Sequence, residues 1–390
     1  MKKSLDKLSE DILDEDFVNI FRPMHFIQYI IGALQVKIQY GYITTSSYGY
    51  NVFSIFIWLT NILSMFVFVA HCESSANSML TDFYLKLSHV LNGLILLIIS
   101  IRSSNKGNLN SEIYVKLQKI DRDLNMKNIM KINKKAYIFS TTFVSVTVLL
   151  GVIWSIILNL YIVEDFCPVA FIVQLPVLGT YMDMSLIFFK LYFIVIRCNH
   201  INTVLKETLR KRSSGFENDK GPLFVSIENN DVDNKLWSCL IITMEDIITV
   251  LEDLINIYQF TIFSITCEFM LLNMVLVQSV ITTLKQQIPI NIYSITSIVP
   301  VITFLFFILL LCIIAEILKS KMEDSRKLCT TILYQSKGPT RDNAKRLLLI
   351  LNVNNKISIY GIFGLGIQLP FNLFAITATY TIVLLQFALL

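Results

Sequence analysis

The polar residues with the clearest spacing in this 390-residue chain lie in its last twenty positions, FNLFAITATYTIVLLQFALL. Asn372, Thr379 and Gln386 recur every seven residues and therefore share one stripe of a helix. Tyr380 and Phe387 form a second stripe beside it. Polar side chains in a lipid-bound helix are costly unless they meet another helix or water. Two interpretations remain open: hydrogen bonds between helices of one bundle, or the lining of a water-filled pore built from several copies.

The chemistry of such a pore would be set by its lack of charge. Residues 357–390 contain no Asp, Glu, Lys, Arg or His. Amide and hydroxyl groups discriminate weakly between hydrated ions. The pore interpretation therefore predicts a poorly selective pathway for cations such as Na⁺, K⁺ and Ca²⁺.

Two carboxyl groups deep inside apolar segments are the next candidates for chemistry. Asp183 and Glu268 are each 15 residues from the expected outer end of their segment, which is about 22 Å at 1.5 Å per residue. Ionisable groups at that depth face the interior of a bundle. Binding a cationic ligand, coupling a pocket to the pore, and being protonated or paired within one subunit are alternatives that stay open. Lys190, two turns from Asp183, is expected to reach the cytosolic interface.

Composition and motifs exclude several classes of protein. Hydrophobic residues make up 54% and charged residues 16% of the chain, and the mean hydropathy is +0.61, which is too apolar for a freely soluble enzyme. The four histidines show no metal-ligand spacing, and the sequence has no G-x-S-x-G or P-loop motif. We therefore expect no enzymatic activity, no cofactor and no bound metal. The net charge of +4 does not indicate a nucleic-acid partner.

The elements that must position these residues are helices long enough to cross a membrane. A span needs about 20 mostly apolar residues, and this length predicts an all-α membrane protein with seven transmembrane helices. The segments are 51–70, 83–101, 136–163, 168–196, 257–283, 293–318 and 357–390. A shorter run, 26–36, predicts an amphipathic helix at the inner membrane face instead of an eighth span.

The basic residues predict the orientation of these spans. Lys and Arg number five in residues 1–50, nine in 102–135, seven in 197–256 and nine in 319–356, which is 30 of the 33. Since basic loops stay in the cytoplasm, we expect a multi-pass plasma-membrane protein with a cytosolic amino terminus and an extracellular carboxyl terminus. G-protein-coupled receptors have the opposite orientation, and their Asp-Arg-Tyr and Asn-Pro-x-x-Tyr motifs are missing from the corresponding helices.

The cytosolic connections carry helical patterns of their own. In 236–258 the apolar residues follow helical spacing into the fifth span, and 341–356 leads towards the seventh. Apolar faces on such extensions predict an anchor bundle below the membrane. We therefore divide the chain into an amino-terminal cytosolic or interfacial segment (1–50), a six-helix bundle that binds ligand (51–340), and an anchor helix with the pore-lining helix (341–390).

The end of the last helix resembles a known family. Thr379-Tyr380, the five residues TIVLL and Gln386-Phe387 are similar to the TYhhhhhQF signature of insect gustatory receptors, and the amino-terminal FRPMHFIQYIIGAL resembles that family's opening. The resemblance implies a tetrameric ligand-gated cation channel related to insect odorant receptors, a homomer or a heteromer with other gustatory receptor subunits. Thr379, Tyr380, Gln386 and Phe387 would then belong to the pore-forming helix.

The resemblance also implies a ligand pocket open to the outside among the second to sixth helices, which would take a small-molecule tastant. Polar and aromatic residues in the outer halves of these spans are the candidates: His89, Asn92, Trp154, Asn159, Gln174, Tyr181 and Gln278. Sugar-responsive members often carry an acidic residue after Thr-Tyr, whereas this chain has Thr381, which favours a bitter or unassigned ligand. A G-protein-type receptor and a multipass transporter remain the alternatives.

Overall fold

The computed structural model describes residues 12–71 except 35, 40 and 46, scattered positions between 87 and 101, and 106–124, 129–161, 169–218, 228–286, 292–353 and 357–389. Its helices are α2 (Glu15–Ile30), α3 (Tyr48–His71), α5 (Gly107–Asp123), α6 (Ile129–Tyr161), α7 (Val169–Asn218), α8 (Glu228–Gln286), α9 (Ile292–Gln335), α10 (Pro339–Val353) and α11 (Gln368–Leu389). Two antiparallel hairpins accompany them, β1 (Val36–Gln39) with β2 (Tyr42–Thr45) and β3 (Ser358–Ile359) with β4 (Phe363–Gly364).

Six of the described helices are long and apolar enough to cross a membrane. They contain the predicted segments 51–70, 136–163, 168–196, 257–283 and 293–318 for all or most of their length, and most of 357–390. Most of the predicted span 83–101 lies outside the described residues. A mostly helical fold is therefore confirmed, while the count of seven spans and the orientation of the termini stay predictions.

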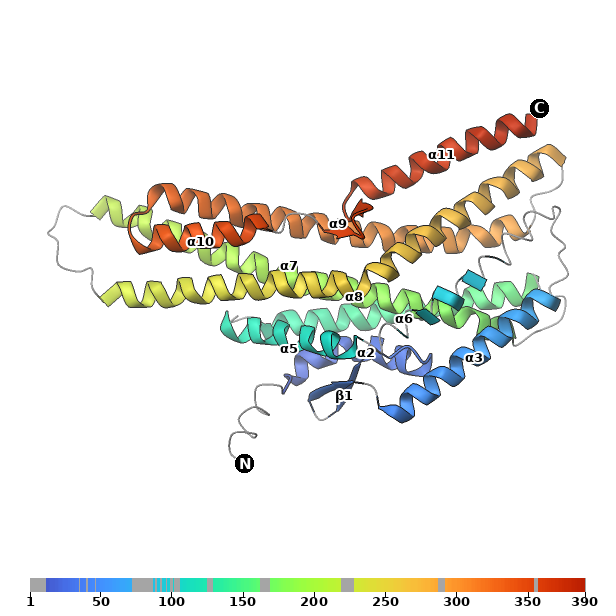
Figure 1. The fold of residues 1–390 in the computed structure, drawn as a ribbon, viewed down its shortest axis with the longest axis horizontal. Helices are drawn as coiled ribbons and strands as arrows, with labels where there is room; N and C mark the ends of the chain where they lie inside the picture. Colours follow the sequence, from blue (N-terminus) through green and yellow to red (C-terminus); the bar gives the residue numbers. More distant parts are fainter. Residues whose placement is uncertain are drawn as a thin grey trace.

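Three helices are much longer than a membrane is thick. α7, α8 and α9 contain 50, 59 and 44 residues, or about 75, 88 and 66 Å at 1.5 Å per residue. A hydrocarbon layer of about 30 Å accounts for less than half of each. Their extensions run side by side with α10 at the end of the molecule opposite the free end of α11 (Figure 1). The prediction that 236–258 continues without a break into the following span is confirmed by α8.

The core of the bundle is built around α7, which packs against α2, α3, α6, α8 and α9. In its most apolar stretch, 89% of the residues are buried, whereas the corresponding share is 22% in α3 and α6 and 17% in α11. The three peripheral helices therefore present apolar side chains outwards, as expected of surfaces that contact lipid or another subunit.

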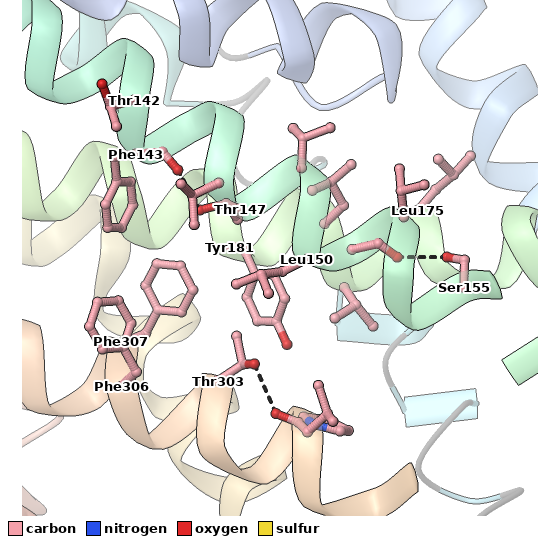
Figure 2. Close-up of a pocket in the computed structure, with 18 of the residues that line it drawn as sticks. Thr142, Phe143, Thr147, Leu150, Ser155, Leu175, Tyr181, Thr303, Phe306 and Phe307 are labelled. Atoms are coloured by element: carbon pink, nitrogen blue, oxygen red, sulfur yellow. Dashed lines mark hydrogen bonds between the residues drawn. The ribbon is translucent and has the colours of Figure 1, made fainter. Parts of the chain in front are cut away.

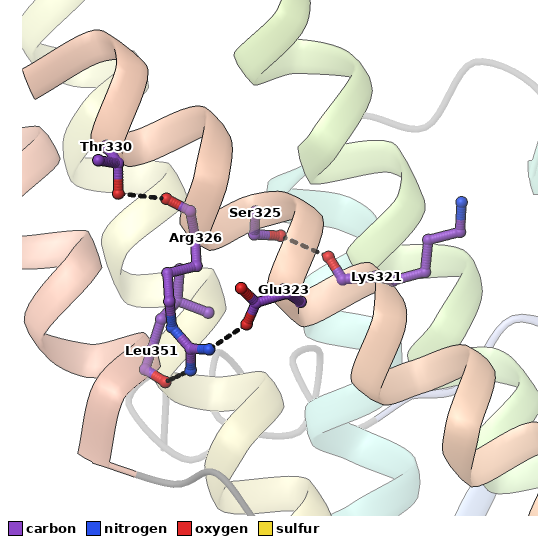
Figure 3. A network of polar contacts seen from close by, with 6 residues as sticks. All are labelled: Lys321, Glu323, Ser325, Arg326, Thr330 and Leu351. Carbon is purple, nitrogen blue, oxygen red and sulfur yellow. Dashed lines mark hydrogen bonds and ion pairs between the residues drawn. The ribbon is translucent and has the colours of Figure 1, made fainter.

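The carboxyl-terminal end of α10 is held against α9 by polar contacts around one arginine (Figure 3). Arg326 on α9 forms an ion pair with Glu323 one turn earlier. Its guanidinium also donates a 2.8 Å hydrogen bond to the carbonyl of Leu351, near the end of α10. A cation at a helix carboxyl terminus satisfies exposed carbonyls and opposes the helix dipole. This contact fastens the carboxyl-terminal end of α10 to α9, away from the short turn that connects the two helices.

Two sequence predictions need correction at turns. The run 26–36 is not one helix, because α2 ends at Ile30 and Gly32 adopts a φ of +73°, which leads into the β1–β2 hairpin. The segment 357–390 is not one span, because the β3–β4 hairpin precedes α11. The turn between its strands holds Tyr360 (φ +52°) and Gly361 (φ +69°). Hydropathy alone does not indicate either turn, because the residues that flank each of them are apolar.

Candidate functional site

A cavity of about 370 Å³ lies between α6, α7 and α9. The helices that form it are adjacent in the bundle, and side chains from all three point into it (Figure 2). The described lining residues are Phe139, Thr142, Phe143, Val146, Thr147, Val148, Leu150, Gly151, Val152, Ser155, Leu175, Val177, Leu178, Tyr181, Val299, Pro300, Thr303, Phe306 and Phe307. None of these is charged, so the cavity offers mainly apolar surface.

The aromatic side of the cavity is an ordered cluster. Tyr181 on α7 stacks on Phe307 of α9 with ring centroids 5.0 Å apart and an interplanar angle of 16°. Phe143 of α6 meets the same Phe307 edge to face at 5.9 Å. Phe143 also stacks on Phe306 at 6.4 Å. Rings from three helices thus form a wall on which a flat apolar molecule can stack.

The polar groups in the cavity are few, and most are used by their own helix. The hydroxyls of Thr147, Ser155 and Thr303 donate to the carbonyls four residues earlier, at 2.9, 2.9 and 2.8 Å. The Tyr181 hydroxyl lies beside the side chain of Thr303, and this pair marks a polar corner on the α9 side (Figure 2). Glu268 of α8, only 3% exposed, is close enough to act electrostatically on Tyr181.

A second polar cluster lies where α2, α5, α7 and α8 meet. Gln28 of α2 donates a 2.6 Å hydrogen bond to Asp183, which favours the interpretation of this carboxyl group as paired within one subunit. Lys190 is fully buried and donates to Asn110 at 2.5 Å and to the Tyr258 hydroxyl at 3.0 Å. The expectation that Lys190 reaches the interface with water is therefore wrong. Asp183 and Glu268 are not among the described residues that line the cavity.

The same cluster sets the charge state of His25 on α2. His25 hydrogen-bonds the Tyr114 hydroxyl of α5 at 3.2 Å, and the Lys190 ammonium lies 4.5 Å from the centre of the Tyr114 ring. Burial, together with the positive charge of Lys190, lowers the pKa of His25 to about 3. Burial also raises the pKa of the Tyr114 phenol. Both side chains are consequently neutral at physiological pH.

Of the seven predicted ligand-binding residues, Tyr181 is the one that the structure places in the cavity. Gln278 is partly exposed on α8 and is not among the described lining residues. His89, Asn92 and the side chains of Trp154, Asn159 and Gln174 lie outside the described residues. Four lining residues were not predicted from the sequence: Phe143, Thr303, Phe306 and Phe307. The spacing of Thr303, Phe306 and Phe307 shows that they share one face of a helix. It does not show that this helix, α9, faces Phe143 on α6.

The predicted pore stripe lies on a helix that stands apart from the bundle (Figure 1). α11 packs on α8 and α9 through its first turns, where Leu369 and Leu373 are buried. Asn372, Thr379 and Gln386 are all exposed. The Thr379 hydroxyl donates to the carbonyl one turn earlier at 2.9 Å. The remaining predicted pore residues are Tyr380, which is partly exposed, and Phe387, whose side chain is outside the described part.

An apolar cavity enclosed by membrane-length helices is suited to a small organic molecule, so the fold and this cavity define a multi-helix membrane protein with a receptor-type pocket. The sequence matches the family model described as 7tm chemosensory receptor over residues 21–390. The chain belongs to this chemosensory receptor family. Membership confirms the family that the TYhhhhhQF resemblance indicated, and it confirms that the protein is not an enzyme.

Solved structures with the same fold include an insect receptor. The insect olfactory receptor OR5 from Machilis hrabei is 12% identical, with a TM-score of 0.68, and the match covers 95% of this chain and 100% of that one. Its complex with eugenol gives 13% identity, a TM-score of 0.66 and the same coverage. A search of curated protein sequences finds no match. At these identities the likeness shows a shared fold.

Proposed function

We propose that this protein is a gustatory-type chemosensory receptor that acts as a ligand-gated, poorly selective cation channel of the plasma membrane. A small organic tastant enters the cavity between α6, α7 and α9 from the extracellular side. Its binding favours an arrangement in which α11 helices from several subunits open an aqueous path. The observation that carries the proposal is the apolar cavity with one polar corner.

The cavity supports an uncharged, largely apolar ligand. Its volume corresponds to about 12 water-sized volumes of ~30 Å³, which suits a compact aromatic or terpenoid molecule. A sugar would bury several hydroxyl groups against this lining, and each hydroxyl without a partner costs roughly 1–3 kcal/mol. A bitter-type or unassigned ligand therefore fits better than a sugar, in agreement with Thr381 at the position where sugar-responsive relatives often carry an acid. The eugenol complex of the related receptor supports a small phenol as a first probe.

The distribution of charge supports the orientation. With 30 of 33 basic residues in the amino-terminal segment and the even-numbered connections, the amino terminus and α10 are cytoplasmic and the end of α11 is extracellular. The lining residues of α7 and α9 lie near the amino-terminal ends of these helices. In this orientation those ends are extracellular, so the cavity lies in the outer half of the membrane.

The exposure of α11 supports assembly from several copies, and we propose a homo- or heterotetramer. Few residues in this helix are buried by its own chain, and its polar stripe of Asn372, Thr379 and Gln386 has no charged group. Several such stripes around an axis would line a neutral pore for Na⁺, K⁺ and Ca²⁺. The remaining faces would contact lipid and neighbouring subunits.

Electrical recording in cells that express the chain tests the proposal. Eugenol, sucrose and a cationic alkaloid are applied outside, and cells without the receptor are the control. We expect agonist-evoked current for the neutral aromatic compound and none for sucrose, and the current should persist in excised patches without GTP. Signalling that requires GTP and produces no direct current would favour a G-protein-type receptor. Uptake of labelled compound without conductance would favour a transporter.

A further inference from the structure

Helix α9 contains both the cavity lining and a contact with the start of α11. The cavity uses α9 residues between 299 and 307. Cys312 and Glu316 follow Phe307 by five and nine residues, or about 7.5 and 13.5 Å along the helix. Residues 301–335 contain neither Gly nor Pro and remain helical throughout. Because this segment has no built-in hinge, a displacement at the cavity reaches Cys312 and Glu316.

The contact is made at a glycine. The Cys312 thiol, 1% exposed, lies beside the backbone of Gly366. A Cβ at position 366 would lie 3.2 Å from Glu316 Oε2, which is closer than ordinary van der Waals contact. Glu316 also pairs with Lys319 on its own helix at 3.5 Å. A side chain at position 366 would therefore displace the Glu316 carboxylate from its present position by a few tenths of an ångström.

Gly366 also lies two residues before α11 begins. The amide of Leu365 closes the β3–β4 hairpin by donating to the Ile357 carbonyl at 2.9 Å. Three residues after Gly366, the Leu369 amide donates to the Gly366 carbonyl at 3.0 Å and starts the helical turn. The hairpin itself rests on α8, where Phe263 meets the Tyr360 ring edge to face at 5.9 Å. Gly366 therefore lies between the hairpin held by α8 and the largely exposed α11.

We propose that Cys312 and Glu316 are positioning residues that transmit occupancy of the cavity to α11 through their contact with Gly366. The proposal rests on the channel function proposed above, and it names the step between ligand binding and opening. The ligand alters the position of α9, the contact with Gly366 carries that change to the first turn of α11, and α8 holds the hairpin in place. Both the ligand and the pore thereby bias one packed element, which is the physical basis of coupling between sites.

The test combines concentration–response curves with ligand binding, measured as the agonist-induced rise in melting temperature of the purified receptor. Gly366→Ala is compared with Gly364→Ala, where the nearest atom to an added Cβ is 3.9 Å away. We expect Gly366→Ala to change the EC50 for current by roughly 2–30-fold and to leave the agonist-induced rise in melting temperature unchanged. Gly364→Ala should behave as wild type. Glu316→Ala alone should also shift the EC50, because it removes one of the two α9 residues that contact Gly366.

A second pair of variants applies if Gly366→Ala does not reach the cell surface. Cys312→Ala is compared with Cys329→Ala, a fully buried cysteine of α9 beyond the contact. A shift in EC50 for Cys312→Ala alone supports the proposal. Equal responses within either pair, or a wild-type EC50 in Glu316→Ala, overturn it. A wild-type receptor that binds agonist without current overturns the channel function and this inference with it, and is thereby distinguished from failure of the contact alone.

Discussion

Gly151 of α6 lines the cavity without a side chain of its own, so an added methyl group probes the cavity directly. A Cβ at this position would lie 3.8 Å from Leu178 Cδ1, which is ordinary contact. Gly151→Ala therefore fits without a clash but removes about one of the roughly 12 water-sized volumes that a ligand can use. Replacing glycine inside a helix with alanine also stabilises the helix by roughly 0.5–1 kcal/mol.

Gly151→Ala should weaken the binding of a ligand that fills the cavity while it stabilises the helix. These opposite effects make the prediction specific. A methylene-sized change in an apolar pocket alters binding by about 1–3 kcal/mol, or roughly 10–200-fold. We expect at least a tenfold rise in EC50 for an agonist that fills the cavity, a smaller rise for a compact agonist, and a further rise with Gly151→Val. The melting temperature of the ligand-free Gly151→Ala receptor in detergent should increase or stay level.

The assay pairs concentration–response curves for agonists of graded size with thermal denaturation of the ligand-free protein. Leu149→Val on the same helix is the matched control, since Leu149 is 58% exposed and is not among the described lining residues. An unchanged EC50 for agonists of every size would refute the assignment of the cavity. A joint loss of stability and potency would show that Gly151→Ala damages the fold and not the site.

Three further predictions concern charge and the pore. Arg197 is fully buried and forms an ion pair with Asp121 at 2.6 Å. Arg197→Met leaves the buried Asp121 carboxyl group without its cation, which should lower the free energy of unfolding by about 3–5 kcal/mol. The melting temperature should then fall by roughly 5 °C. Lys119→Met, at an exposed ion pair, should change the melting temperature little. Equal losses of melting temperature in Arg197→Met and Lys119→Met would contradict the argument that the buried ion pair matters more than the exposed one. His25 has its pKa lowered to about 3 against about 6.5 when unfolded, so only the unfolded chain gains this proton as the pH falls. Between pH 7.5 and 5 the native state should lose roughly 2 kcal/mol from this group, and denaturation of His25→Gln should lack that part of the pH dependence. Gln386→Ala should alter the permeability ratios among Na⁺, K⁺ and Ca²⁺, and unchanged ratios would remove Gln386 from the pore lining.

The sequence predicted the long helices well because the length of an apolar run is a local property. It failed at the β3–β4 hairpin, since Ile359 and Phe363 are as apolar as the helix that follows. The closely spaced Gly361, Gly364 and Gly366 were the available signal for a turn. Hydropathy could not distinguish a hairpin from a helix within one continuous run.

The polar partners of the buried charges also could not be predicted from the sequence, because they are distant from those charges in the chain. Lys190 is bonded to Asn110 and Tyr258, which are 80 and 68 residues away in the chain. Only the packing of α5 and α8 against α7 brings them together. The cavity depends on packing in the same way, since Phe143 and Phe307 each belong to an unremarkable aromatic face until α6 and α9 meet.

The burial of α7 has a consequence for how the protein is made. Asp183 and Lys190, which lie within the predicted span 168–196, and Arg197, which follows it, are all fully buried. A charged group at the centre of an isolated helix opposes membrane insertion by about 2.5–3.5 kcal/mol. Gln28 and Asn110, which bond two of these three residues, belong to α2 and α5 and are synthesised before α7. The partners are therefore already present when α7 meets the translocon. A lesion in α2 should accordingly cause retention in the endoplasmic reticulum and loss of surface receptor, with little change in the ligand response of the molecules that escape.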